Sequence, residues 1–80
     1  METWKLHTEG KETFWRGGKH FPKYVVLDYD KSFRSWHLAP AGFVNPELDR
    51  IRGIQFSSRK KAMRFFDKWS RGKVKIREVV

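Results

Sequence analysis

The sequence predicts an α+β fold in which a small, mainly antiparallel sheet of four to six short strands packs against one helix in the C-terminal half. Short runs of alternating apolar and polar residues, separated by turn residues, are typical of strands. One later segment repeats its apolar residues every three to four positions, which is typical of an amphipathic helix. A chain of 80 residues has the length of one domain, so we expect 1–80 to form a single unit.

The first half of the chain contains the clearest strand patterns. Residues 2–8 and 11–16 alternate in polarity and predict two short strands. The run KYVVLDY at 23–29 is rich in β-branched and aromatic residues and predicts a third strand. SFRSWHL at 32–38 predicts a fourth, which would pair with the third across a short turn at 30–31. These two strands form the clearest predicted hairpin.

The second half begins with a connection. Residues 39–50 contain two prolines and a glycine, which indicate a segment without regular structure. IRGIQF at 51–56 predicts another short strand, and KVKIREV at 73–79 predicts the final one, with alternating Val74 and Ile76.

The segment between those two strands predicts a helix at about 57–71. Ser57 or Ser58 can cap its first free N–H groups, and Gly72 can adopt the left-handed conformation that ends a helix. The apolar residues fall at positions i, i+3, i+4 and i+7, so they form one stripe that we expect to face the sheet: Ala62, Phe65, Phe66 and Trp69.

The composition excludes several classes of protein. Seven Phe, four Trp and two Tyr can give a short chain a stable core, since each large ring removes much area from water. The chain has no cysteine, which excludes disulfides and thiolate zinc sites and suits a reducing compartment. Residues 1–20 carry charges throughout, and no run has the length of a membrane span. We therefore expect a cytoplasmic protein.

The charge is distributed unevenly along the chain. Residues 1–49 contain seven basic and seven acidic residues, whereas residues 50–80 contain eleven basic residues and two acidic ones. The whole net charge of +9 therefore lies in the second segment. Such an asymmetry indicates a polyanionic partner, most often a nucleic acid, and then an anionic membrane or an acidic protein surface.

Three cations, Arg59, Lys60 and Lys61, stand in the first turn of the predicted helix. A helix N-terminus is partly positive and favours acidic residues, so these cations are either a tolerated solvated surface or part of an anion site. Further basic residues on the exposed side of the helix and on the last predicted strand favour the anion site. The candidate nucleic-acid-binding or anion-binding residues are Ser57, Ser58, Arg59, Lys60, Lys61, Arg64, Lys68, Arg71, Lys73, Lys75 and Arg77.

Two tryptophans are candidates for stacking on bases. Trp15 stands beside Arg16, and Trp36 lies in the predicted hairpin. Aromatic side chains edged by cations bind single-stranded nucleic acid with little sequence preference. In a chain this small, the alternative for any tryptophan is a place in the core.

Signals for catalysis or a metal are weak. Asp28 and Asp30 could hold magnesium, but the stronger interpretation is that they are turn residues that close the hairpin. The three histidines have no metal-binding spacing, and Gly17-Gly18-Lys19 is too short for a phosphate-binding loop. We therefore predict a protein that is not an enzyme and has no cofactor and no metal site.

The stretch IRGIQFSSRKKAMRFF, with a strand ending at Phe56-Ser57 and a helix with Ala62 and Phe66 inward, resembles the small sheet-plus-helix DNA-binding domains at the amino ends of some phage integrases. The resemblance covers about a third of the chain and implies DNA binding. In those domains the sheet enters the major groove, whereas the basic residues here favour the helix and the last predicted strand.

These observations favour a nucleic-acid-binding protein that contacts mainly phosphate groups. The alternative is a small regulator or inhibitor, such as a phage-type accessory protein, that docks its basic face on an acidic protein surface, for example the channel of a host enzyme that processes nucleic acid. A membrane is a weaker alternative, because the apolar stripe of the helix is needed for the core. The sequence leaves open DNA or RNA, one strand or two, and any sequence preference.

Overall fold

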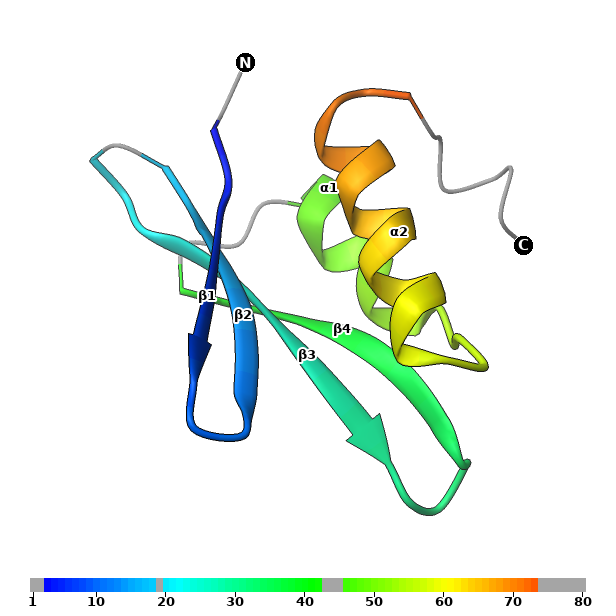
Figure 1. Cartoon of the computed structure of the whole chain (residues 1–80). Helices are drawn as coiled ribbons and strands as arrows, with labels where there is room; N and C mark the ends of the chain where they lie inside the picture. Colours follow the sequence, from blue (N-terminus) through cyan, green and yellow to red (C-terminus); the bar gives the residue numbers. More distant parts are fainter. Residues whose placement is uncertain (1–2, 19, 43–45, 74–80) are drawn as a thin grey trace.

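The computed structural model describes residues 3–18, 20–42 and 46–73, and it confirms the α+β fold (Figure 1). Four antiparallel strands form one sheet in the order β1-β2-β3-β4, and the helices follow the sheet in the sequence. The elements are β1 (Lys5–Glu9), β2 (Glu12–Gly17), β3 (Lys23–Asp30), β4 (Ser35–Gly42), the short helix α1 (Pro46–Asp49), the 3-10 helix η1 (Arg50–Gly53) and α2 (Arg59–Ser70). No helix in these described ranges is long and apolar enough to cross a membrane.

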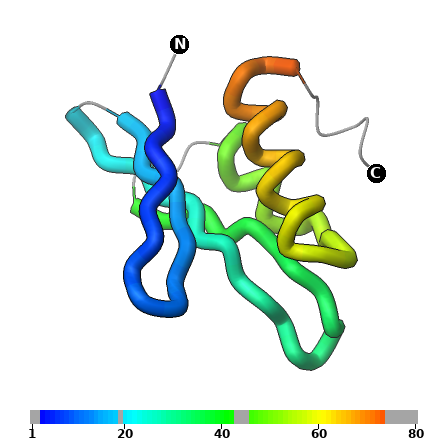
Figure 2. The backbone as a smooth tube through the Cα atoms, viewed as in Figure 1, coloured from blue at the N-terminus to red at the C-terminus, as the bar shows by residue number. Residues whose placement is uncertain are grey.

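Tight turns join two pairs of neighbouring strands, so that the chain runs back and forth across the sheet (Figure 2). Gly10 turns between β1 and β2 with a φ of +60°, a conformation that glycine adopts without steric cost. Between β3 and β4, the Asp30 carboxylate accepts hydrogen bonds from the amides of Ser32 (2.8 Å) and Phe33 (3.3 Å). Asp30 is therefore a turn-forming residue, as one of the two sequence interpretations proposed.

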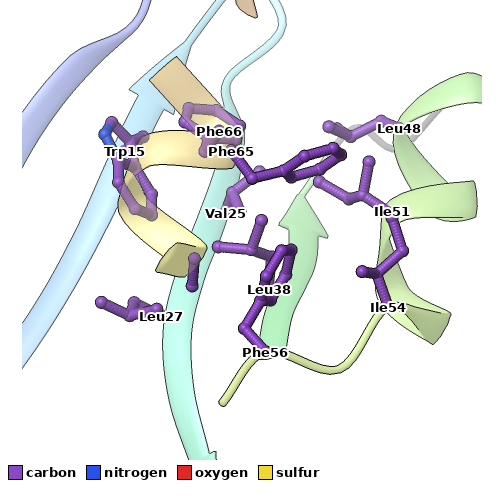
Figure 3. Close-up of a cluster of buried hydrophobic side chains, with 11 residues drawn as sticks. Trp15, Val25, Leu27, Leu38, Leu48, Ile51, Ile54, Phe56, Phe65 and Phe66 are labelled. Atoms are coloured by element: carbon purple, nitrogen blue, oxygen red, sulfur yellow. The ribbon is translucent and has the colours of Figure 1, made fainter. Parts of the chain in front are cut away.

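One face of the sheet forms the core together with the helices (Figure 3). Paired residues of antiparallel strands point to the same face, and Trp15 of β2 lies opposite Val25 of β3. Leu27 lies opposite Leu38 of β4 in the same way. The buried hydrophobic residues are Trp15, Val25, Leu27, Leu38, Leu48, Ile51, Ile54, Phe56, Ala62, Phe65 and Phe66.

Helix α2 packs its predicted stripe against this face. Ala62, Phe65 and Phe66 are buried, and Trp69 is partly buried against the same cluster. The side chain of Ser58 caps the helix, and Gly72, with a φ of +73°, follows its end. The predicted helix, its cap and its stripe are thus confirmed, with bounds of Arg59–Ser70 inside the expected 57–71.

The strand predicted at 51–56 is wrong. Its first residues belong to η1, and only Phe56 bridges the sheet, through two backbone hydrogen bonds of 2.8 Å with Trp36. The reason lies in the spacing of the buried residues Leu48, Ile51 and Ile54, which recur every three positions. That period matches the 3.0 residues per turn of a 3-10 helix and not the period of two of a strand.

The connection predicted at 39–50 is also partly wrong. Strand β4 continues to Gly42 and includes Pro40, which pairs with Val25 of β3. Proline is tolerated there because β4 is the last strand of the sheet, where an N–H group directed away from β3 is not needed for pairing. Of the strand predicted at 73–79, all but Lys73 lies outside the described residues.

Gly17 leaves room for the ring of Trp4. A Cβ atom at this position would lie 2.7 Å from two carbon atoms of the indole, closer than packed carbon atoms approach. Gly17→Ala is therefore expected to displace Trp4 and to lower the free energy of unfolding by ~1–3 kcal/mol, measured by urea denaturation. The control is Gly53→Ala, because a Cβ there has no atom within 4 Å. Equal stabilities of the two variants would contradict the placement of Trp4.

Candidate nucleic-acid interface

The outward side of α2 carries a row of cations. Lys60, Lys61, Arg64 and Lys68 are exposed, and none of them forms an ion pair with a carboxylate of the described residues. Arg71, about one turn beyond Lys68, pairs with Asp67 at 3.2 Å. We call the first four residues the basic face of α2.

The basic face opposes helix stability. Lys60 and Arg64 are four residues apart, as are Arg64 and Lys68, and like charges at this spacing repel each other by a few tenths of a kcal/mol per pair. The single acidic residue of α2, Asp67, pairs with a residue beyond the helix end. Stability of the helix therefore does not explain this arrangement, whereas an anionic partner would relieve it.

The two serines before α2 differ in their roles. The Ser58 hydroxyl oxygen accepts a hydrogen bond from the amide of Lys61 at 3.1 Å, which satisfies one free N–H group of the first turn. Ser57 is exposed. The amide of Lys61 therefore already has its acceptor, whereas the side chains of Lys60 and Lys61 are exposed.

Arg59 is one of the three cations in the first turn of α2, and it has a structural role. Its guanidinium donates a hydrogen bond of 3.0 Å to the Thr13 hydroxyl on β2. Thr13 is buried, so this bond satisfies a polar group at the edge of the core. Arg59 thus links the start of α2 to the sheet, and its place in the sequence has a structural explanation that Lys60 and Lys61 lack.

The structure places the remaining candidates in different surroundings. Trp15 is 7% exposed and its ring packs on Phe66 at 4.4 Å, so it belongs to the core and has little surface on which a base could stack. Trp36 is partly buried against Tyr29 at 5.1 Å, on the same face as the core, as expected for paired hairpin residues. Lys73 is exposed just after α2. Lys75 and Arg77 lie outside the described residues.

Sequence reasoning missed a groove beside the basic face. Trp4 and Leu6 at the start of the sheet and Met63 on α2 line this groove, which also reaches Lys60 and Arg64. Leu6 is 50% exposed, although the alternation of residues 2–8 does not show which face of that strand is covered. Met63 lies beside the apolar stripe of the helix, and that position is the one sequence signal for a second apolar surface.

The acidic residues of β3 contact neighbouring groups of the β3–β4 hairpin. Asp28 lies 3.5 Å from His37 on β4 and accepts a hydrogen bond from the amide of Tyr29. Within residues 3–18, 20–42 and 46–73, no three His, Asp or Glu side chains lie close enough to hold a metal ion.

No family model, curated protein or solved structure matches this chain.

Proposed function

We propose that this chain binds nucleic acid and contacts the phosphate backbone through the basic face of α2. The observation that supports the proposal is the set of four exposed cations, Lys60, Lys61, Arg64 and Lys68, without ion-pair partners in the described part of the chain. Phosphate contacts supply most of the affinity of proteins that bind nucleic acid without strong sequence preference.

The dimensions of α2 suit this role. Twelve residues of helix are about 18 Å long, so cations spaced along it can reach several consecutive phosphates of one strand. The apolar stripe holds the opposite side of the helix against the sheet, so the basic face stays exposed and fixed in direction. Cations held on a rigid helix lose less conformational freedom on binding than cations on a loop.

An acidic protein surface would attract the same cations. A regulator or inhibitor that docks on such a surface is the alternative, and no contact in the described residues favours it over nucleic acid. The two functions differ in what the purified chain retains: nucleic acid of any sequence, or one acidic protein from an extract treated with nuclease.

The proposal predicts a strong dependence of binding on salt. If about four phosphates are contacted, the slope of log K against log salt is expected to be near −4 for duplex DNA and near −3 for a single strand. Fluorescence anisotropy of labelled oligonucleotides at several salt concentrations measures both slopes. An affinity that does not change with salt, or no binding at low salt, would refute the proposal and leave the acidic protein partner as the better explanation.

A further inference from the structure

A groove of about 540 Å³ separates the start of the sheet from α2. Its volume falls in the range of ~300–1,000 Å³ typical of pockets that bind small molecules. Five apolar side chains line it, from both sides of the groove: Trp4, Leu6 and Trp15 from the sheet side, and Met63 and Phe66 from α2.

Trp4 gives the groove a fixed aromatic wall. Its ring lies against Gly17, where no side chain intervenes, and contacts the ring of Phe66 in a T-shaped arrangement with a centroid distance of 5.3 Å and an interplanar angle of 85°. Leu6 is half exposed at the other end of this wall. A flat apolar ligand could therefore enter beside Trp4 and Leu6 without disturbing the core.

The polar side chains of the groove favour an anion at its rim. Lys60 and Arg64, two members of the basic face of α2, line it. Asp67 also lines it, but its carboxylate is compensated by Arg71 at 3.2 Å. Ser70 completes the polar lining, and its hydroxyl donates to the carbonyl oxygen of Asp67. The net charge of this rim is therefore positive.

We propose that the groove receives the base of one unpaired nucleotide while Lys60 and Arg64 bind the adjacent phosphates. This inference rests on the proposed function and adds to it a preference for single strands. A nucleotide combines a flat aromatic base with an anionic phosphate, which matches the aromatic wall and the cationic rim. In a duplex each base is paired and stacked, so it could enter the groove only after unpairing.

The preference can be measured with three oligonucleotides of equal length. One is oligothymidylate, one has the same backbone but abasic sites in place of the bases, and one is a duplex. We expect oligothymidylate to bind about tenfold more tightly than the abasic strand, because stacking of a base adds to phosphate binding. Equal affinities for these two strands would overturn the groove as a base site and leave phosphate binding by α2 intact.

Two uncharged substitutions test the location. Leu6→Gln makes the groove polar without changing charge, and the half-exposed position should tolerate it. We expect this variant to lose most of the tenfold preference for bases while its affinity for the abasic strand stays within about twofold. Phe33→Gln, at an exposed site in the β3–β4 turn, is the matched control and should keep the preference. Equal loss in both variants would overturn the proposed location.

An NMR titration of the unsubstituted protein separates this inference from the proposed function. The Trp4 indole N–H signal, assigned with Trp4→Phe, is expected to shift with oligothymidylate but much less with the abasic strand. The amides of Lys60 and Arg64 should shift with both. Shifts of α2 alone with both strands would overturn the base site only. No shifts and no binding with any of the three oligonucleotides would overturn the proposed function as well.

Discussion

Replacing Phe66 with alanine is expected to lower the free energy of unfolding by ~3–5 kcal/mol. Phe66 is fully buried, and its ring contacts those of Trp4, Trp15 and Trp69 at centroid distances of 5.3, 4.4 and 5.7 Å. Alanine would leave a cavity among three large rings that cannot all collapse into it. Such a loss is a large share of the ~5–15 kcal/mol that stabilises a typical protein, so the variant is expected to be partly unfolded at 37 °C.

Urea denaturation followed by tryptophan fluorescence and circular dichroism measures this loss. Phe33→Ala is the control, because Phe33 is 69% exposed and its replacement should change stability by less than about 0.5 kcal/mol. A loss below about 1 kcal/mol for Phe66→Ala would show that α2 does not pack on the sheet as described.

Reversing the charge of the basic face is expected to leave the stability of the protein nearly unchanged and to weaken its binding to nucleic acid strongly. In the triple variant Lys60→Glu, Arg64→Glu and Lys68→Glu, affinity for DNA is expected to fall about 100-fold or more at moderate salt, since three phosphate contacts become repulsive. Stability should change little, because a negative charge at position 60 suits the start of the helix, whereas glutamates four residues apart repel each other as the cations did and position 68 lies near the helix end. Arg59 is left unchanged because it bonds to Thr13.

The matched control reverses the same number of charges at exposed lysines away from α2: Lys5, Lys11 and Lys31. Anisotropy titrations and thermal denaturation of both triple variants give the comparison. If both bind equally weakly, the attraction comes from net charge alone and the basic face has no special role. If only the α2 variant unfolds, the cations have a structural function that the described contacts do not include.

The parts of the fold that could be predicted from sequence are those with a regular local signal. The stripe of α2 repeats at helical spacing, and the cap at Ser58 and the end at Gly72 are residue types with a clear physical preference. The strand prediction at 51–56 was wrong because β-branched residues favour a strand locally, whereas the buried residues Leu48, Ile51 and Ile54 recur every three positions. The connection predicted at 39–50 was partly wrong for a related reason. The effect of Pro40 on strand stability depends on whether its strand lies at an edge of the sheet, which the local sequence does not show.

Some features of the candidate site could likewise be predicted from the sequence, and others could not. The basic face could be predicted because helical spacing alone directs Lys60, Arg64 and Lys68 away from the apolar stripe. The hydrogen-bond partner of Arg59 could not be predicted, since Thr13 is 46 residues away in the sequence. Nor could the groove, because it forms only where Trp4 and Leu6 approach α2 across the edge of the sheet.

The strand order has a consequence for how the chain folds. Each strand pairs with its neighbour in sequence, so forming the sheet requires only short loops to close and costs little chain entropy, which favours rapid formation. During synthesis, however, the strands β1 to β4 emerge before any helix, and the sheet side that carries Val25 and Leu38 is not fully covered until α1, η1 and finally α2 have emerged. A nascent chain therefore passes through a stage with an apolar sheet face in water. Substitutions that weaken α2 should lengthen this stage and raise aggregation in cells more than their effect on equilibrium stability suggests.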